Sequence, residues 1–303
     1  MSNYINTKIT TDGAEMLASQ KYKKRSRFGE IFHRVRQNKG AMVGAIIIII
    51  MILTFFASLT ISFDAVTVSN VRNRLAPPSW QYPLGTDNIG RNLFLRLVYG
   101  TRYSLVIGLG VVGIGVIVGV LLGSIAGYYG GKTEQIIMRV TDVYSSVPGI
   151  LLGMVIMTAL GQTLPNLICA CGITTIPMFV RISRASVLTV RNNEFVEAAH
   201  SIGLPNLRII LTEVLPNGLS PIIVTVSASI GMSITVAAAM SYMGFGVQVP
   251  HPEWGAMISA GSDFARSAPW VMTFPGVAIM FVVLAFNLLG DGLRDALDPK
   301  LKK

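Results

Sequence analysis

Residues 143–180 read VYSSVPGILLGMVIMTALGQTLPNLICACGITTIPMFV, a run of 38 positions without Asp, Glu, Lys, Arg or His. A helix needs about 20 apolar residues to cross a bilayer, so this run is long enough for two crossings. Near its middle stands GQTLPN at 161–166, whose glycine, proline and asparagine are typical of a turn. We therefore predict two membrane helices here, near 144–160 and 164–181.

Four further charge-free windows extend the pattern along the chain, at 40–63, 103–131, 214–250 and 267–290. Each is long enough for a membrane crossing. The window 214–250 is predicted to hold one helix, near 218–241, followed by a stretch rich in glycine and proline. The sequence thus predicts an all-α, polytopic membrane protein with six transmembrane helices.

The composition favours the same fold class. Of the 303 residues, 51% are hydrophobic and only 13% are charged, about half of the ~25% that is typical of soluble domains. The net charge of +10 would suit a nucleic-acid binder, but its distribution suggests topology instead. With both termini cytoplasmic, most Lys and Arg residues fall on the inner side, as the positive-inside rule requires. A model with five helices would put the basic C-terminal end outside.

The helices divide the chain into segments with expected locations. The first 39 residues are too polar for the start of a signal peptide, so the first helix is expected to remain uncleaved. The expected segments are a cytoplasmic N-terminal tail (1–39), a first transmembrane helix (40–63), an extracellular or periplasmic segment (64–102), a core domain with five transmembrane helices (103–290) that includes a cytoplasmic loop (193–216), and a cytoplasmic C-terminal tail (291–303).

The sequence contains no recognisable catalytic or metal-binding motif. It has neither an HExxH pattern nor a G-x-S-x-G nucleophile elbow, and Cys169 and Cys171 are spaced as apolar residues of a helix rather than as a CxxC pair. Residues 127–133 resemble a phosphate-binding loop, but Ala126 stands where its first glycine is required and a membrane helix precedes it. We interpret this segment as a helix end broken by glycines. We expect no catalytic residue, metal or cofactor in this chain, and no nucleic-acid partner.

The strongest motif is the predicted loop 193–216, which reads NEFVEAAHSIGLPNLRIILTEVLP. Gly203 suits the position just after a helix, and Pro205 suits the first turn of the next one. The loop is therefore predicted to be a short helical hairpin. Apolar residues recur at i, i+3, i+4 and i+7 in both arms, at Phe195, Ala198, Ala199 and Ile202 and at Leu207, Ile210, Leu211 and Val214.

Three interpretations of this hairpin compete. It could lie on the membrane or pack on its own bundle, as its amphipathic arms allow. It could be a DNA-binding helix–turn–helix, but the second arm offers one basic residue, Arg208, and no polar set for reading bases. The third interpretation, which we favour, is a docking element that inserts into the groove of a partner.

The hairpin resembles the EAA loop of bacterial ABC-importer permeases. Glu197-Ala198-Ala199, Gly203 and Leu215-Pro216 have the spacing of that loop, although Glu213 stands where an isoleucine is usual. Three other stretches make the chain similar to the C-type permease of the dipeptide, oligopeptide and nickel importers: PLGTDNIGRNLFLRLVYGTRYSL at 83–105, GFGVQVPHPEWGAM at 244–257 and LLGDGLRDALDP at 288–299.

The resemblance implies an ABC type I importer permease fold in a bacterial inner membrane. It implies that the chain forms half of a pore with a second, paralogous permease, that two ATPase subunits bind and hydrolyse the ATP, and that an extracellular or periplasmic substrate-binding protein delivers the cargo. This chain would then contact lipid and perform no catalysis itself. The residues implied to form the ATPase-coupling loop are Phe195, Glu197, Ala198, Ala199, Ile202, Gly203, Leu207, Leu215 and Pro216.

The implied cargo is a di- or oligopeptide. Nickel, glutathione or another small solute remains an alternative within the same class. A non-transporting membrane scaffold or receptor is the alternative from another class. Because the membrane windows hold no charge, they favour low-specificity passage over a carrier driven by protons or sodium.

Several expectations concern residues at the membrane borders. The segments 64–102 and 242–270 are implied to form the outer docking face. A helix start is predicted at Thr86-Asp87, with Trp80 as an interfacial anchor. Trp254 and Trp270 are interpreted as aromatic-belt residues or, alternatively, as contacts for the binding protein. Asp142 is expected to pair with Arg139, three residues earlier on one helix.

Overall fold

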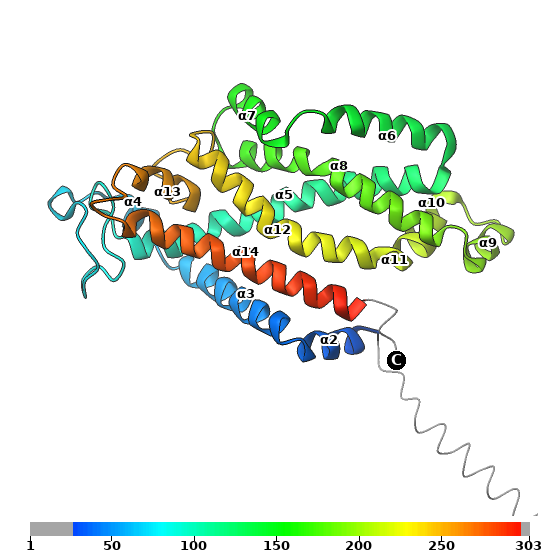
Figure 1. Cartoon of the computed structure of the whole chain (residues 1–303), viewed down its shortest axis with the longest axis horizontal. Helices are drawn as coiled ribbons and strands as arrows, with labels where there is room; N and C mark the ends of the chain where they lie inside the picture. Colours follow the sequence, from blue (N-terminus) through cyan, green and yellow to red (C-terminus); the bar gives the residue numbers. More distant parts are fainter. Residues whose placement is uncertain (1–26, 298–303) are drawn as a thin grey trace, which may run out of the picture.

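The chain folds into an elongated bundle of helices in the computed structural model, which describes residues 27–297 (Figure 1). In that range we find helices, turns and one isolated β-bridge, and no strand. Five helices are long and apolar enough to cross a membrane. They are α3 (Lys39–Ser58), α5 (Leu93–Tyr129), α8 (Leu164–Val190), α12 (Leu219–Tyr242) and α14 (Trp270–Leu297).

A sixth span is formed by two helices with a sharp bend between them. Helix α6 (Gly131–Ser145) and helix α7 (Gly149–Leu160) meet at an angle of 80°. The break lies at Pro148, because proline disfavours helical geometry in the residue before it. Counting the bent pair as one span gives the six crossings that the sequence predicts, and the predicted turn separates α7 from α8. The helix expected near 144–160 is wrong at its start, because it begins only at Gly149.

Several helix ends differ from the charge-free windows, among them the end of α8 at Val190 instead of 180 and the end of α14 at Leu297 instead of 290. Helix α3 ends at Ser58 instead of 63, and α5 begins at Leu93 instead of 103. The early start of α5 includes two arginines, which the windows excluded. They are tolerated because Arg96 donates to the Val66 carbonyl at 2.7 Å and Arg102 donates to the Ser58 hydroxyl at 2.9 Å.

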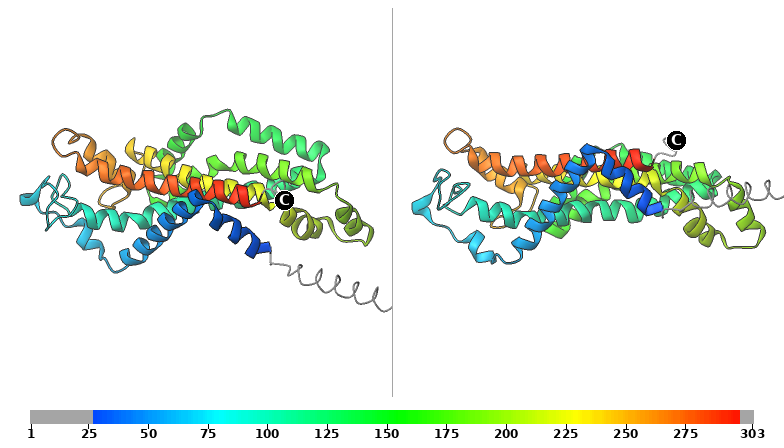
Figure 2. Two further views of the ribbon diagram at one scale, coloured as in Figure 1. Left: turned by 60° about the horizontal axis from the view of Figure 1, so that its bottom comes forward. Right: turned by 90° about the horizontal axis from the view of Figure 1, so that it is seen from below.

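Helices α5 and α8 lie side by side along the bundle (Figures 1 and 2). Glycines recur on α5 at every fourth position from 115 to 127 and face α8, which is the small-residue spacing that lets membrane helices approach closely. A Cβ atom at Gly127 would lie 2.9 Å from the carbonyl oxygen of Arg184. Larger side chains at these positions would therefore force the two backbones apart.

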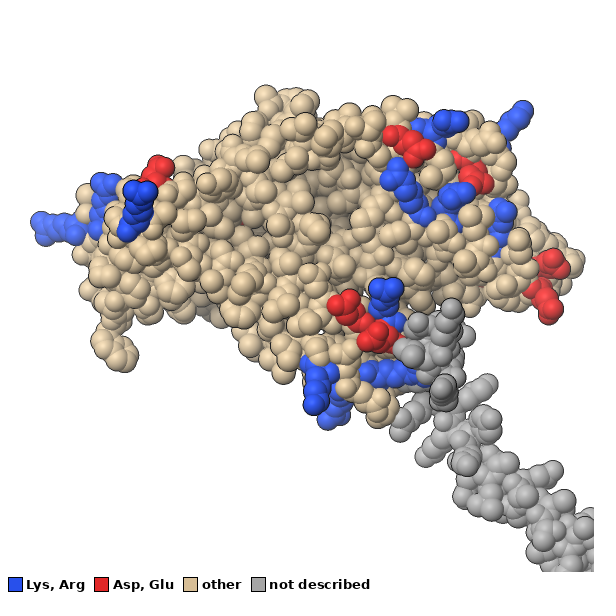
Figure 3. All heavy atoms as spheres, viewed as in Figure 1, with Lys and Arg blue, Asp and Glu red and all other residues tan. Residues whose placement is uncertain are grey.

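The surface has the charge distribution of a membrane protein. On the face shown in Figure 3, Lys, Arg, Asp and Glu form groups at the left end, at the right end and at the lower centre, and a broad uncharged band lies between the left group and the others. Large apolar side chains of the membrane helices are exposed, such as Ile117 on α5, which is 72% exposed. An exposed apolar surface of this kind suits a bilayer, whose hydrocarbon core is about 30 Å thick.

The N-terminal helix α2 (Arg27–Gln37) packs near the end of α14. The Asn38 side chain caps α3 and also donates to the Asp295 carboxylate at 2.9 Å. The predicted cytoplasmic tails are only partly covered, since residues 1–26 and 298–303 lie outside the described range.

The opposite end of the molecule carries an outer lobe, built from residues 59–92 and 243–269 (Figure 2). Besides loops it contains α4 (Phe63–Thr67), the short 3-10 helix η1 (Val71–Asn73) and α13 (Trp254–Ser262). The expected helix start at Thr86-Asp87 is wrong. Asp87 is buried and accepts from the Nε atom of Arg91 at 2.6 Å, so its carboxylate supports a loop.

The tryptophans expected at a membrane belt or at a binding-protein contact stabilise this lobe instead. Trp254 is 3% exposed and donates its indole N–H to the Leu97 carbonyl at 3.0 Å. Trp270 donates to the Thr86 carbonyl at 3.3 Å. Trp80 is fully exposed on a loop, where no helix forms.

Glu253 caps the first turn of α13 from a buried position. Its carboxylate accepts from the amides of Gly255 and Ala256, both at 2.8 Å. Burial nevertheless raises the pKa of this carboxyl group, since the loss of hydration outweighs the two amide bonds.

Candidate functional site: the hairpin between α8 and α12

The predicted hairpin is present, and it protrudes at the end of the molecule opposite the outer lobe (Figures 1 and 2). Its first arm is α9 (Glu194–Ser201). Its second arm is divided into α10 (Asn206–Ile209), a π-helical turn η2 (Ile210–Val214) and α11 (Leu215–Asn217). The π turn precedes Pro216, which lacks the N–H that would continue a regular α-helical ladder.

The reversal between the arms depends on Gly203. This residue has φ +79°, the left-handed region that favours glycine. Its amide donates to the His200 carbonyl at 2.9 Å, and the Leu204 amide donates to the Ala199 carbonyl at 3.2 Å. These two bonds form a Schellman motif, so the turn predicted at Gly203 has a complete hydrogen-bonded cap.

One face of the hairpin packs on its own bundle. Val196, Ala199, Ile209 and Val214 form an apolar cluster with α8 residues such as Val187. Val196 and Ile209 were not in the predicted apolar stripes. The buried face is thus displaced from the predicted one, although Ala199, Ile210 and Val214 lie on it.

The displacement leaves a set of large apolar side chains exposed. Glu197, Ala198 and Pro216 are exposed as well, and Leu215 is half-buried. We call the following four residues the exposed apolar set: Phe195 (40% exposed), Ile202 (75%), Leu207 (61%) and Leu211 (52%). Because the described part of this chain does not cover these side chains, they are free to contact a partner.

A tyrosine at the end of α5 ties both arms together. The Tyr128 hydroxyl lies 2.9 Å from Nε2 of His200 and donates to the Asn206 side-chain oxygen at 3.2 Å. A hydroxyl has one proton, so His200 Nε2 is the donor to Tyr128 in this arrangement. This contact could not be predicted from the sequence, because no periodic pattern links residues that lie 72 positions apart.

Charged side chains fix α8 to its neighbours at the same end. Arg184 donates from Nε to the Glu134 carboxylate of α6 at 2.6 Å, and Arg191 donates to the Gly127 carbonyl at 2.6 Å. Asp142 pairs with Arg181 of α8 at 3.0 Å, so the expected partner Arg139 is wrong. A pairing pattern within one helix cannot show that another helix offers a better-placed cation.

The other candidate sites of the sequence have structural explanations. Gly130 and Gly131 both have positive φ and separate α5 from α6, as the interpretation of residues 127–133 requires. Cys169 is exposed and Cys171 is buried, both on α8. Within residues 27–297, no three His, Cys, Asp or Glu side chains are grouped closely enough to hold a metal ion.

Comparison with known families gives two matches that together cover most of the chain. The family model described as binding-protein-dependent transport system inner membrane component matches residues 119–303. The model described as the N-terminal transmembrane domain of oligopeptide transport permease C matches residues 26–78.

Three curated relatives are similar over nearly their whole length. The dipeptide transport system permease protein DppC of Alkalihalophilus pseudofirmus is 45% identical, over 90% of both chains. The glutathione transport system permease protein GsiD of Pectobacterium atrosepticum is 41% identical, over 88% of this chain and 89% of the relative. The di/tripeptide transport system permease protein DppC of Pseudomonas aeruginosa is 41% identical, over 90% of this chain and 92% of the relative.

A solved structure has the same fold at low sequence identity. The MetNI methionine ABC transporter in an inward-facing conformation matches with a TM-score of 0.57 and 17% identity. The match covers 68% of this chain and 98% of the MetNI chain.

Proposed function

Because the chain belongs to the family of binding-protein-dependent transport system inner membrane components, we propose that it carries dipeptides or short oligopeptides into the cell. It is a multi-pass inner-membrane permease subunit of an ABC importer, with the fold of type I permeases. The names of its relatives support the peptide cargo, since the relative at 45% identity is a dipeptide permease.

Glutathione is the second candidate cargo. Relatives at 41% and 42% identity are glutathione permeases, and glutathione is itself a small peptide. The charge-free windows of the sequence are compatible with both cargoes, because they hold no fixed charge that would select one of them. Selection would be made by the binding protein that delivers the cargo.

The hairpin is the proposed coupling element. Its exposed apolar set and Ala198 would bury against the groove of an ATPase subunit, in the helix-in-groove mode. The partner would bind and hydrolyse ATP, and this chain would move between inward-open and outward-open states as the hairpin is displaced. Tyr128, which bonds both arms, would transmit that displacement to α5.

The proposed assembly has this chain beside a second, paralogous permease, above two ATPase subunits and below a substrate-binding protein. Both termini and the hairpin would be cytoplasmic. The arrangement of the bundle supports this orientation, since α2, the end of α14 and the hairpin lie towards the same end (Figure 1). The outer lobe would then receive the binding protein.

The test is reconstitution of the complete importer in vesicles, with uptake of a labelled dipeptide and of labelled glutathione measured beside ATP hydrolysis. We expect ATP-dependent dipeptide uptake that requires the binding protein. The variant Gly203→Asp should remain inserted but lose uptake, because it strains the turn and adds a charge beside the exposed apolar set.

Normal uptake in Gly203→Asp would refute the coupling role of the hairpin. Co-purification from native membranes that recovers no ATPase subunit would favour the scaffold or receptor alternative.

A further inference from the structure

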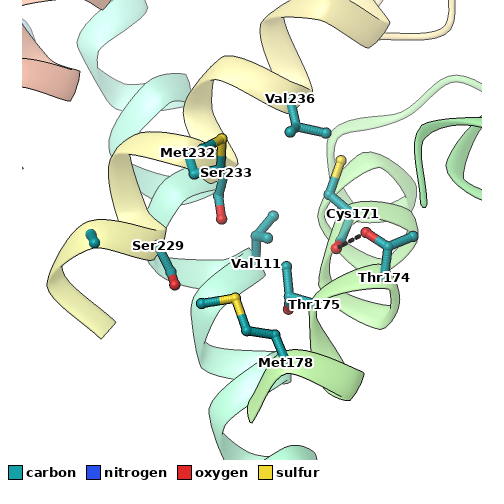
Figure 4. Close-up of a pocket in the computed structure, with 10 residues that line it drawn as sticks. Val111, Cys171, Thr174, Thr175, Met178, Ser229, Met232, Ser233 and Val236 are labelled. Carbon is teal, nitrogen blue, oxygen red and sulfur yellow. Dashed lines mark hydrogen bonds between the residues drawn. The ribbon is translucent and has the colours of Figure 1, made fainter. Parts of the chain in front are cut away.

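Two helices face each other across a hollow near the middle of the bundle, with α5 as its floor (Figure 4). Helix α8 contributes residues 171, 174, 175 and 178, and α12 contributes residues 229, 232, 233 and 236. Both sets have the spacing i, i+3, i+4 and i+7, so each forms one face of its helix. The hollow has a volume of about 200 Å³, room for roughly six or seven water molecules at ~30 Å³ each.

The lining of this hollow combines hydroxyl groups with flexible sulfur side chains. Figure 4 shows Thr174 and Thr175 on α8 across from Ser229 and Ser233 on α12. Met178 and Met232 also lie at the hollow, and they are 43% and 64% exposed. None of its lining residues is charged.

The Ser229 hydroxyl has no hydrogen-bond partner in the described structure. The residue is 6% exposed and its oxygen points towards the hollow in Figure 4. A buried hydroxyl without a partner costs about 1–3 kcal/mol. Such a group is best explained by a partner that the chain itself does not supply.

A second hollow continues the first along the same face of α8. It shares Thr174 and Met178 with the first and extends to Arg181, one further turn towards the hairpin. Tyr144 also lines it, and the Tyr144 hydroxyl is a second buried group without a hydrogen-bond partner in the described structure. The two hollows together form a track along the middle of α8, from Cys171 to Arg181.

We propose that this track is a surface over which the peptide passes, and that the first hollow binds an uncharged segment of it. The proposal rests on the proposed function of the chain as a peptide permease. Thr174 and Thr175 donate to carbonyls of their own helix, so they offer acceptors to peptide N–H groups, and the unpaired Ser229 hydroxyl offers a donor to a peptide C=O group. The methionines adapt to side chains of different shapes. Since the first hollow holds no charge, it selects neither a terminus nor an ionised side chain.

Helix packing is the competing explanation, because small hydroxyl residues also lie between membrane helices. The hollow would then be filled by the second permease and would be inaccessible to water in every state. Cysteine accessibility distinguishes the two explanations. The variants are Thr174→Cys and Met232→Cys, each in a background with Cys169→Ser and Cys171→Ala. Ile117→Cys is the control, since Ile117 is 72% exposed on α5 and does not line the hollow.

The reconstituted importer is treated with a water-soluble methanethiosulfonate reagent, with and without a transported dipeptide. We expect both track cysteines to react and the dipeptide to slow their reaction at least fivefold. The control Ile117→Cys, whose side chain lies outside the hollow, should show no change in reaction rate with the dipeptide. Track cysteines that stay unreactive through the whole ATP cycle, or that react at a rate the dipeptide does not change, would overturn the proposal.

A second variant separates this proposal from the function on which it rests. Ser229→Val removes the hydroxyl and puts a larger side chain into the hollow, so dipeptide uptake should fall at least tenfold while ATP hydrolysis stays within about twofold. Uptake by the unsubstituted importer is measured in parallel. If that importer carries no peptide, the proposed function fails. If it carries dipeptide and Ser229→Val does so equally well, only the track is refuted.

Discussion

The substitution Ile202→Ala tests whether the hairpin docks on another subunit. Ile202 follows α9 directly and is 75% exposed, so the fold of this chain gains little from its side chain. A docked partner would bury it. The substitution should therefore weaken binding of the ATPase subunit and leave the stability of the permease unchanged.

The size of the effect follows from the area that is open to burial. Isoleucine loses three carbon atoms on conversion to alanine, worth about 2.4 kcal/mol at ~0.8 kcal/mol per buried CH₂ group. Only the exposed three quarters of the Ile202 side chain is available for burial by a partner, which leaves a loss of about 1.8 kcal/mol in binding free energy. Since 1.4 kcal/mol is tenfold in affinity, the Kd for the ATPase subunit should rise about 20-fold.

The assay titrates the ATPase subunit onto the permease pair in nanodiscs and measures Kd. Ile117→Ala is the matched control, because Ile117 is an isoleucine of nearly equal exposure on a membrane helix. Val196→Ala is the stability reference, since Val196 is 1% exposed and its truncation should lower the melting temperature. A Kd within twofold of the unsubstituted protein for Ile202→Ala would refute docking through the hairpin.

Three further predictions follow from individual contacts. In Gly203→Ala the new Cβ atom meets no atom within 4 Å, but the residue must keep a left-handed φ. The substitution should therefore lower the stability of the hairpin turn by about 1–2 kcal/mol and speed hydrogen exchange at the Leu204 amide. Gly203→Asn should have a smaller effect, because asparagine tolerates a left-handed φ better. Tyr128→Phe should raise the rate of tryptic cleavage at the exposed Arg208, because both hydrogen bonds to the hairpin are lost, whereas Tyr129→Phe should not. Burial raises the pKa of Glu253 in the folded protein above its ordinary value of 4.5. As the pH rises past 4.5, the Glu253 carboxyl group loses its proton in the unfolded chain before it does so in the folded protein, so the stability of the fold decreases. The melting temperature of the unsubstituted protein should therefore decrease with rising pH relative to Glu253→Gln, and equal slopes would contradict the prediction.

The number of spans and the turn of the hairpin were predictable because both depend on local sequence. A charge-free run of sufficient length is enough to mark a membrane helix, and Gly203 marks a left-handed residue without reference to anything distant. The early start of α5 was not predictable. Arg96 and Arg102 are accepted within it only because distant carbonyl and hydroxyl groups satisfy them.

The sequence pattern also could not predict which face of the hairpin is buried. Periodicity identified apolar residues in both arms, but it does not say which of them meet the parent bundle and which meet a partner. The structure makes that division, with Val196 and Ile209 inside and Ile202 and Leu207 outside. The role of Trp254 was missed for a similar reason, because its hydrogen-bond acceptor at Leu97 is far away in sequence.

The row of glycines on α5 has a mechanical consequence. With backbones in direct contact at Gly127 and its counterparts, α5 and α8 cannot slide along each other without steric collision. The two helices therefore move together as one rigid unit. Tyr128, at the end of α5, connects this unit to the hairpin by a hydrogen bond. Any opening of a passage must then occur between other helices, and α8 and α12 already leave a hollow between them.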